Sequence, residues 1–357
     1  MSKHNNFIGY WTSQEQYSLH DLLQFVIEAE RGGFTATMTS DHFHPWWHDN
    51  GYGNFTWVWL AAAAERTKNM KFLTGVTAAM YRYNPAIIAQ AFASLDVLYP
   101  GRIGLGIGTG EAMNEVSVGS DWPPAEIRLE RTTEAIQIIK QLWNKNNNAN
   151  HASSNAVDSN NNKNNNGFVS FNGDHFRTKN ARLYTPPVTD IPLYMAASGS
   201  KATQTAAKYA DGLITISTPD AVKEMFDTFD EAARASGRDS TSLEKIGKPI
   251  VSFAEDYDKA FASTEFWRAG QLENNFDIDV NDPRDLQQKA KQEVSDDKLK
   301  KSVIIVTSID DLIKPIEDHF KAGFTQIYLH STSPDELDFV HKFCNKVLPY
   351  FKEKADR

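Results

Sequence analysis

Residues 35–46 read Thr35-Ala-Thr-Met-Thr-Ser-Asp-His-Phe-His-Pro-Trp46. The run from Thr35 to Thr39 is typical of a strand, and a carboxylate, an imidazole and an indole fixed behind a proline follow where it ends. A second strand-like run, residues 102–108, is also followed by polar residues, in the segment Thr109-Gly-Glu-Ala-Met-Asn114. Two strand ends that carry one base-type and one acid-type residue are what proton-coupled chemistry at a shared mouth requires.

Short strand-like runs alternate with helix-length periodic segments along the chain. The expected strands are residues 7–11, 35–39, 71–76, 102–108, 192–197, 212–216, 249–254 and 326–330. The expected helices include residues 19–31, 57–67, 85–98, 126–143, 201–210 and 221–236. Strict β/α alternation predicts parallel strands, and eight of them predict a (β/α)8 TIM barrel with insertion segments. A doubly wound sheet is the weaker alternative, because no compact nucleotide-binding half ends near residue 150.

We expect one barrel domain over residues 1–357 with two insertions. Residues 144–167 form an asparagine-rich, low-complexity insertion with almost no apolar content, so they lack the apolar surface that would order them. Residues 256–300 are long for one barrel helix and are expected to form an insertion over the C-terminal face. Residues 168–176 indicate a hairpin, and residues 301–307 indicate one strand beyond the eight.

Composition excludes several classes of function. The chain has 357 residues and a formal net charge of -9 without a basic stripe, which argues against nucleic acid or an anionic membrane surface as partner. The single cysteine, Cys344, allows no intrachain disulfide, and no ligand spacing indicates a metal. No apolar run reaches the roughly 18 residues of a membrane span. These observations predict a cytoplasmic protein.

The side chains at the two polar strand ends have complementary chemistry. In a TIM barrel the C-termini of the strands converge on one mouth, so His42 and Glu111 can flank one ligand. A neutral histidine is a competent base near pH 7, and Trp46 can wall a flat cofactor or donate its N–H to a substrate oxygen. The alternative is structural: Asp41 and His42 cap their own loop, and Trp46 packs against it.

Glycines and small residues suggest room for a planar, phosphorylated ligand. Gly104, Gly106, Gly108 and Gly110 alternate within the strand, which differs from the dinucleotide-binding pattern and removes one face of side chains. Tight core packing would explain the same glycines. The segment Ser198-Gly-Ser-Lys201 opens a helix and suits a phosphate, although Ser198 or Ser200 would serve equally as an N-cap.

Five motifs together carry a family resemblance. They are Ile8–Tyr10, Ser40-Asp-His-Phe-His-Pro-Trp46, Arg82–Phe92, Leu98–Arg102 and Gly108-Thr-Gly-Glu-Ala-Met-Asn-Glu115. The chain resembles the bacterial-luciferase-like superfamily, and within it the dehydrogenases that use coenzyme F420, an 8-hydroxy-5-deazaflavin. The similarity is dense over the first 145 residues and looser after about residue 217.

The resemblance implies a role for each motif residue. It implies that His42 takes the substrate hydroxyl proton while hydride moves from the carbinol carbon to the deazaflavin, that Glu111 protonates the ring, and that Trp46 holds the forming carbonyl. The residues implied to contact the cofactor are Asp41, Gly75, Val76, Thr109, Gly110, Asn114, Ser198 and Gly199. Gly75–Val76 matches a non-prolyl cis peptide of the family, and no metal is implied.

The resemblance implies that the substrate is an alcohol or a sugar phosphate. Sugar-phosphate dehydrogenases of this group hold phosphate with lysine and arginine, and those positions align with Pro219, Asp277 and Ser302, none of them basic. Lys301 and Arg268 lie nearby and could substitute. We therefore favour an uncharged, secondary alcohol, with glucose-6-phosphate as the alternative. The first predicts a small aromatic-lined pocket beside His42, and the second predicts a basic cluster near Lys301.

Other functions fit the sequence less well. A methylene-tetrahydromethanopterin reductase or an FMN-dependent monooxygenase of the same superfamily would not need His42, Trp46 and Glu111 together. A non-catalytic ligand-binding barrel would lack the acid and the base. The relatives pair as dimers, so we expect a homodimer, for which Trp57, Trp59 and Leu60 offer an apolar helix.

Overall fold

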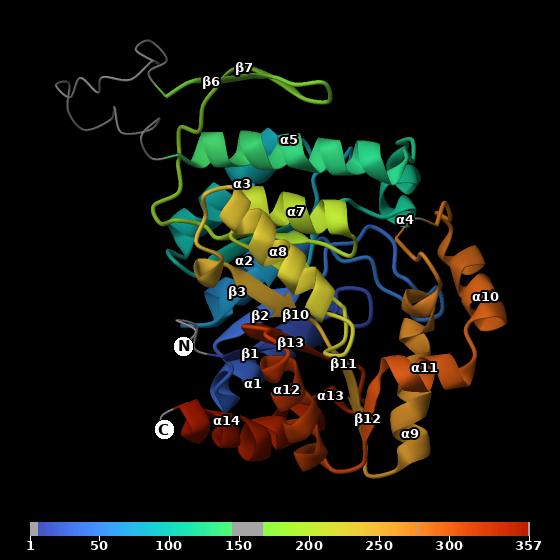
Figure 1. Ribbon diagram of the computed structural model, residues 1–357. Helices are drawn as coiled ribbons and strands as arrows, with labels where there is room; N and C mark the ends of the chain where they lie inside the picture. The colour runs from blue at the N-terminus through green and yellow to red at the C-terminus, as the bar shows by residue number, and fades with distance from the viewer. Residues whose placement is uncertain (1–5, 145–166, 277, 356–357) are drawn as a thin grey trace.

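A closed ring of parallel strands forms the centre of the protein. The computed structural model describes residues 6–144, 167–276 and 278–355. Eight strands follow one another in the order β1, β2, β3, β5, β8, β9, β10 and β13, and parallel pairing of β13 with β1 closes the ring. The helices lie around the outside (Figure 1). This is the (β/α)8 barrel expected from the alternation of the sequence.

The barrel strands are short and the helices vary in length. The ring consists of β1 (Phe7–Thr12), β2 (Ala36–Thr39), β3 (Lys71–Thr74), β5 (Ile103–Gly108), β8 (Leu193–Ala196), β9 (Gly212–Thr215), β10 (Glu244–Gly247) and β13 (Gln326–Ser331). The outer helices include α1 (Leu19–Gly32), α2 (Thr56–Arg66), α3 (Pro85–Leu98), α5 (Ala125–Trp143), α7 (Ser200–Tyr209), α8 (Lys223–Ala235), α12 (Ile313–Lys321), α13 (Glu336–Lys342) and α14 (Leu348–Ala355).

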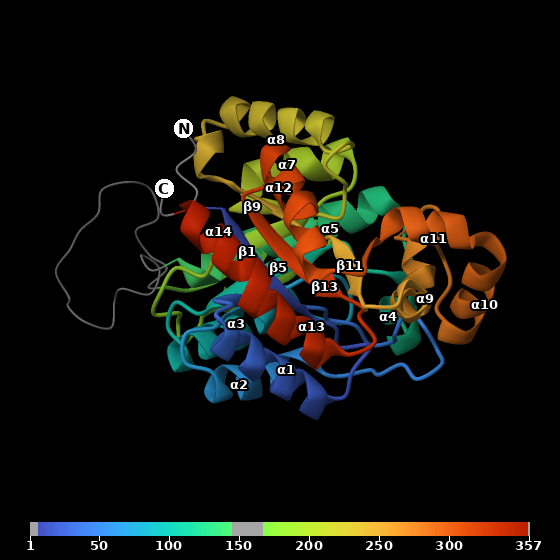
Figure 2. The same cartoon turned by 90° about the horizontal axis from the view of Figure 1, so that it is seen from below.

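Local sequence signals fix where the helices begin and end. The Ser18 side chain accepts a hydrogen bond from the backbone of Asp21 at the start of α1, and Gly33 ends that helix in the left-handed conformation at φ 105°. Asn84 caps α3, whose first residue is Pro85. Viewed from below, α1, α2 and α3 lie side by side along one flank of the barrel (Figure 2).

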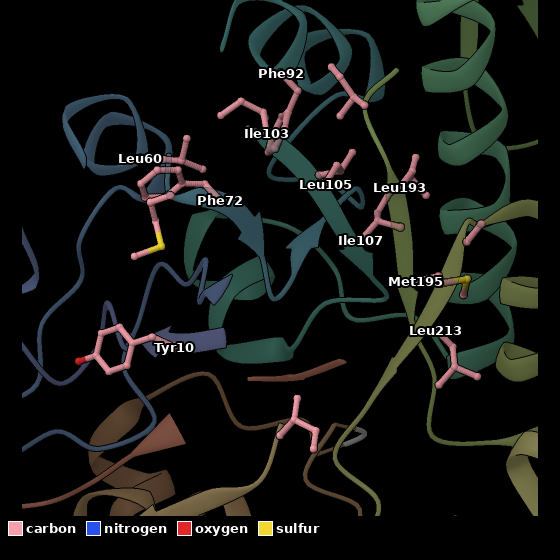
Figure 3. Packing of buried hydrophobic residues seen from close by; sticks show 14 of the residues in the cluster. Tyr10, Leu60, Phe72, Phe92, Ile103, Leu105, Ile107, Leu193, Met195 and Leu213 are labelled. Atoms are coloured by element: carbon pink, nitrogen blue, oxygen red, sulfur yellow. The ribbon is translucent and has the colours of Figure 1, made fainter. Parts of the chain in front are cut away.

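Apolar side chains pack on both sides of the barrel wall. Ile103, Leu105 and Ile107 on β5 lie close to Leu193 and Met195 on β8 in the layer between strands and helices (Figure 3). A smaller cluster that includes Trp11, Met38, Leu73, Ile214 and Tyr328 is separate from this layer. Each fully buried side chain of this size stabilises the fold by roughly 1.5–3 kcal/mol. The closed wall therefore fixes where each strand ends.

Helix α2 contributes to this core two of the three residues that the sequence offers for a dimer contact. Trp59 and Leu60 are fully buried in the layer between strands and helices. Trp57 is partly buried and donates through Nε1 to Asp41. Trp59 and Leu60 are therefore unavailable to a second subunit, and the core interpretation of them is correct.

The seventh barrel strand differs from the expected one. Residues 244–247 form β10, which pairs with both β9 and β13, whereas β11 (Ile250–Phe253) pairs with β13 and with the extra strand β12 (Ile304–Val306). Glu244 and Lys245 made this strand look polar, although neighbouring strands supply its hydrogen bonds. The expectation that residues 301–307 carry an additional strand is confirmed by β12.

Two segments decorate the barrel. A hairpin of β6 (Val169–Asn172) and β7 (Arg177–Ala181) follows α5, as residues 168–176 indicated, and lies beyond α5 in Figure 1. Between β11 and β12 the described residues form α9 (Tyr257–Ala262), η4 (Ser263–Gln271), α10 (Pro283–Glu293) and α11 (Asp296–Ser302). Their buried residues share a small core with Trp46, Trp47 and Met113. Most of the asparagine-rich segment, residues 145–166, lies outside the described residues.

In the described part of the chain, no helix combines the length and the apolar character that a membrane span needs.

Candidate active site

A cavity of about 560 Å³ opens where the barrel strands end. Aromatic, small and charged side chains contribute to its wall. They include Trp11, Glu15, Met38, His42, Trp46, Gly75, Val76, Gly108, Thr109, Gly110, Glu111, Ser198, Lys248, Trp267, Phe276, Lys301 and Ser302. Most of the expected site residues therefore meet in one place, because parallel barrel strands all end at the same face.

His42 lies between two carboxylates. Its Nδ1 is 2.5 Å from Oε1 of Glu15, and its Nε2 is 4.0 Å from Oε1 of Glu111. Burial by itself would lower the pKa of His42, but attraction to Glu15 and Glu111 outweighs burial and raises that pKa above its usual value. The Nε2 side of the ring is thus the side that can exchange a proton in the cavity.

Glu15 is a site residue that the sequence interpretation missed. It is 1% exposed, and its Oε2 accepts a hydrogen bond from Ser40 Oγ at 2.5 Å. Burial tends to raise the pKa of Glu15, but the neighbouring His42 and the Ser40 hydroxyl lower it below its usual value. Glu15 follows the first barrel strand, so the same strand-end argument that identified His42 would have found it.

Glu111 is positioned by Asn114. Asn114 Nδ2 donates to Glu111 Oε2 at 3.0 Å, and Asn114 Oδ1 accepts from the backbone N–H groups of Phe43 and His44 at 2.7 and 3.2 Å. The Asn114 side chain is fully buried and does not line the cavity. It therefore ties the loop after β2, which carries the base, to the loop after β5, which carries the acid.

Asp41 also lies behind the cavity wall. Its carboxylate accepts hydrogen bonds from Trp57 Nε1, Thr77 Oγ1, Arg82 Nη2 and the Tyr83 hydroxyl at 3.2, 2.7, 3.2 and 3.5 Å. It is 2% exposed and is not among the lining residues. Asp41 thus braces the loops after β2 and β4 (Thr77–Ala78), a role closer to the structural alternative for this residue.

Trp46 lies beside the histidine. Its ring centroid is 6.1 Å from that of His42, and 6.2 Å from that of Phe276 in the segment that follows η4. Trp46 is 6% exposed, and no residue in the described ranges accepts a hydrogen bond from its Nε1. The indole therefore has an N–H that a ligand in the cavity could use, while its ring packs in the cluster with Trp47, Met113 and Trp267.

The opposite wall is made of glycine and small residues. The Gly75–Val76 peptide bond is cis, as the family resemblance implied. A Cβ on Gly108 would lie 2.5 Å from Val76 Cγ2, and Gly110 has a positive φ of 75°. Gly104 and Gly106 are not among the lining residues, and a Cβ on Gly106 would meet the Thr74 carbonyl at 2.0 Å. Gly108 and Gly110 line the cavity, but close contact with Val76 already requires glycine at position 108, and the positive φ favours it at position 110. Close packing likewise explains Gly104 and Gly106.

The start of α7 lies at another edge of the cavity. Ser198 lines it, Gly199 is the N-cap residue, and no side chain caps the helix. The first backbone N–H groups of this helix are therefore available to an anion. Gly199 is exposed and is not among the lining residues.

The expected substrate-binding cations are only partly in place. Lys301 lines the cavity together with Pro219 and Ser302, whereas Asp277 lies outside the described residues. Arg268 does not line it: its guanidinium contacts Glu265, Asp296 and the backbone carbonyl of Val294. Arg268 is therefore not free to bind a phosphate, and the suggestion that it substitutes for a missing cation is wrong.

Lys248 is the second residue that the sequence interpretation missed. It follows β10 and lines the cavity between the indole rings of Trp11 and Trp267. Its Nζ lies 3.4 Å from Nδ1 of His330. The signal was obscured because the strand before it was not recognised, so Lys248 was not counted as a strand-end residue.

Comparison with known proteins gives one family. A model of the family described as luciferase-like monooxygenase matches residues 3–326. An F420-dependent glucose-6-phosphate dehydrogenase of Microbacterium testaceum is 33% identical over 97% of both chains, and one of Mycolicibacterium smegmatis is 31% identical over 98% of both. A solved F420-dependent secondary alcohol dehydrogenase, in complex with an F420-acetone adduct, is 35% identical with a TM-score of 0.87 over 99% of both chains. These matches confirm the resemblance carried by the motifs.

Proposed function

The chain belongs to the luciferase-like monooxygenase family, and we propose that it is a coenzyme F420-dependent dehydrogenase that oxidises a CH–OH group to a carbonyl. The carrying observation is the position of His42 between Glu15 and Glu111 at the wall of one cavity. A base, an acid and a flat slot are what hydride transfer from an alcohol requires.

The residues present fit a deazaflavin. The cis Gly75–Val76 segment and Gly108 form a wall without bulky side chains, and a Cβ on Gly75 would collide with Met38. Thr109 and Gly110 continue this wall, and Ser198 with Gly199 would hold the cofactor phosphate at the start of α7. Asp41 and Asn114 would support the cofactor indirectly, by fixing the loops that carry Arg82 and Glu111.

Each catalytic side chain has one task. The bound cofactor supplies the hydride acceptor. His42 takes the hydroxyl proton on Nε2 as the carbinol C–H bond breaks and the carbonyl forms, while Glu15 stabilises the imidazolium on the Nδ1 side. Trp46 would donate its N–H to the carbonyl oxygen, and Glu111, in its protonated form, would supply the proton that accompanies the hydride.

A sugar phosphate is the first substrate candidate. The two compared dehydrogenases of Microbacterium and Mycolicibacterium carry that activity in their names, which supports this alternative better than the uncharged alcohol that the sequence favoured. Lys248 lines the cavity beside the ring of Trp11 and could meet a negative charge.

An uncharged secondary alcohol is the second candidate. The structural relative with an F420-acetone adduct supports it, and so do the aromatic walls formed by Trp11, Trp46, Trp267 and Phe276. Pro219 and Ser302 stand where the sugar-phosphate group carries cations.

The experiment is a reaction of the purified protein with oxidised F420 and either glucose-6-phosphate or isopropanol, followed by loss of the visible absorbance of the cofactor. Loss with glucose-6-phosphate supports the first candidate, and loss with isopropanol supports the second. If F420 binds but neither alcohol reduces it, both substrate assignments fail. If F420 does not bind, the proposed function fails.

We also propose a cytoplasmic homodimer that pairs through the outer face of α2 and α3. The exposed large apolar side chains of this face are Phe55, just before α2, Val58 on α2, and Ile87, Val97 and Leu98 on α3. Exposed apolar residues on neighbouring helices are typical of subunit contacts.

A further inference from the structure

Few protein groups balance the positive charge of Lys248. Its Nζ lies 4.4 Å from the centroid of Trp11 and 5.7 Å from that of Trp267, so two indole faces form its surroundings. Within the described ranges no carboxylate oxygen lies within 4.0 Å of this nitrogen. Burial lowers the pKa of Lys248 to about 8, and attraction to Glu15 and Glu111 opposes that shift only in part.

The hydrogen-bonding partner of Lys248 carries no charge. Burial, together with the lysine itself, lowers the pKa of His330 well below its usual value, so the ring is neutral. Its Nε2 lies 3.0 Å from the Ser13 hydroxyl, which also accepts from Trp11 Nε1. The neutral ring can accept one Lys248 proton on Nδ1 and donate to Ser13 on Nε2. An ammonium has three donors, and the described residues accept only this one.

We propose that Lys248 anchors an oxyanion, phosphate or carboxylate, on the alcohol that His42 deprotonates, and so selects anionic over uncharged alcohols. The inference rests on the proposed dehydrogenase function. A partly desolvated ammonium with two unused donors binds an anionic oxygen far better than a neutral one. Glu15 and Glu111 both lie beside His42. Lys248 is therefore the group that can form an ion pair with a substrate anion.

Lys301 provides a matched comparison within the same cavity. It also lines the wall, but its side chain is exposed, and a solvated ammonium discriminates weakly between charged and neutral ligands. The proposal therefore predicts different effects of removing each lysine on substrate choice. Loss of Lys248 should change the choice of substrate, whereas loss of Lys301 should change it little.

The test compares Lys248→Met and Lys301→Met with glucose-6-phosphate, a 2-hydroxy acid and isopropanol. For the anionic alcohol that the wild type prefers, Lys248→Met should raise KM by about tenfold or more with a much smaller change in kcat. KM for isopropanol should stay within about threefold, and Lys248→Arg should restore part of the affinity for the anion. Whichever of the two anionic alcohols the wild type prefers then shows whether Lys248 binds a phosphate or a carboxylate.

Equal losses of kcat on charged and uncharged alcohols would instead mean that Lys248 balances the charge of Glu111 or Glu15, and would overturn the proposal. A wild type that reduces F420 with isopropanol and with neither anion would overturn it too, while leaving the dehydrogenase function intact. No F420 reduction with any alcohol, in contrast, would count against the proposed function itself.

Sulfate binding gives a readout that does not depend on turnover. Sulfate keeps its charge over the pH range in question, and its binding to the F420-loaded enzyme can be followed by calorimetry or by tryptophan fluorescence. Affinity should be lost in Lys248→Gln and kept in Lys301→Met, and in the wild type it should weaken as the pH rises through about 8. The other groups facing Lys248 are Trp11, Trp267, neutral His330 and the carboxylates of Glu15 and Glu111. Sulfate binding that is equal in wild type and Lys248→Gln would overturn the assignment.

Discussion

Nδ1 of His42 lies 2.5 Å from Oε1 of Glu15, and the two residues come from loops that follow the adjacent barrel strands β1 and β2. Ser40 holds the other carboxylate oxygen of Glu15. A proton on Nδ1 would face this carboxylate, whereas Nε2 lies on the side of Glu111. The arrangement also means that the strength of the base is set by a residue that does not need to touch the substrate.

Replacing Glu15 with Gln should weaken the base. The neutral form of His42 is the active base, so kcat/KM of the wild type falls as the pH drops below the raised pKa of His42. Without the carboxylate, that pKa falls, and the acidic limb of the kcat/KM profile should move to lower pH. The plateau should drop by about tenfold or more, because the imidazolium loses its partner.

The pH profile separates this role from a purely structural one. A loss of activity without displacement of the acidic limb would show that Glu15 only supports the loop. Ser40→Ala is the milder comparison, since it removes one hydrogen bond to Glu15 and leaves the charge in place. It should give a smaller displacement in the same direction.

Removing the base itself should separate chemistry from binding. His42→Ala should reduce kcat by about a hundredfold to ten-thousandfold, while the dissociation constant of F420 changes little. Rapid single-turnover absorbance gives the first quantity and quenching of F420 fluorescence gives the second. His44→Ala is the control, because His44 bonds to Ser117 and does not line the cavity. Wild-type turnover in His42→Ala would rule out the assigned base.

Stability should fall between mildly acidic and mildly alkaline pH because of Glu336. Burial raises the pKa of Glu336 from 4.5 to about 8, although hydrogen bonds from Tyr10 and Tyr17 act in the other direction. The folded protein thus holds a proton that the unfolded chain releases. The contribution is fully present below about pH 4.5 and is lost as the pH rises to about 8, with a slope of at most about 1.4 kcal/mol per pH unit.

Glu336→Gln mimics the protonated carboxyl and should remove this dependence. Urea unfolding at several pH values measures it, with the exposed Glu353→Gln as the matched substitution. An unchanged pH dependence in Glu336→Gln would mean that the carboxyl is ionised in the folded protein.

The outer face of α2 and α3 gives a test of the dimer. Val58 is 65% exposed and Ile87 is 53% exposed, so Val58→Glu with Ile87→Glu should leave the fold intact and disfavour burial of this face in an interface. Light scattering should report a monomer for the double variant and a dimer for the wild type. Val118→Glu, on η1 (Val116–Val118), is a control at a 41% exposed valine outside α2 and α3, and it should remain dimeric. If the double variant keeps the wild-type mass, the dimer interface does not lie on α2 and α3.

The predictable parts of the site depend on local patterns. His42 and Glu111 each stand three residues past a strand whose β-branched or glycine-alternating run is easy to recognise, and the barrel rule then brings them together with Trp46 of the same loop as His42. Glu15 and Lys248 were missed for different reasons. Glu15 stands at the same distance past its strand, but in a polar loop without a recognisable motif, and Lys248 follows a strand that begins with two charged residues.

Periodicity and short contiguous motifs are enough to predict the eight-stranded alternation, the convergence of the motif residues on one mouth and the family. The folded structure was needed to show that Asp41 and Asn114 lie behind the wall, that Arg268 is already paired and that Lys248 faces the cavity without a carboxylate beside it. These features need the fold because burial and charge balance depend on partners that are distant along the chain. A residue's type shows what it can donate or accept, and its neighbours in space determine whether that capacity remains available for a ligand.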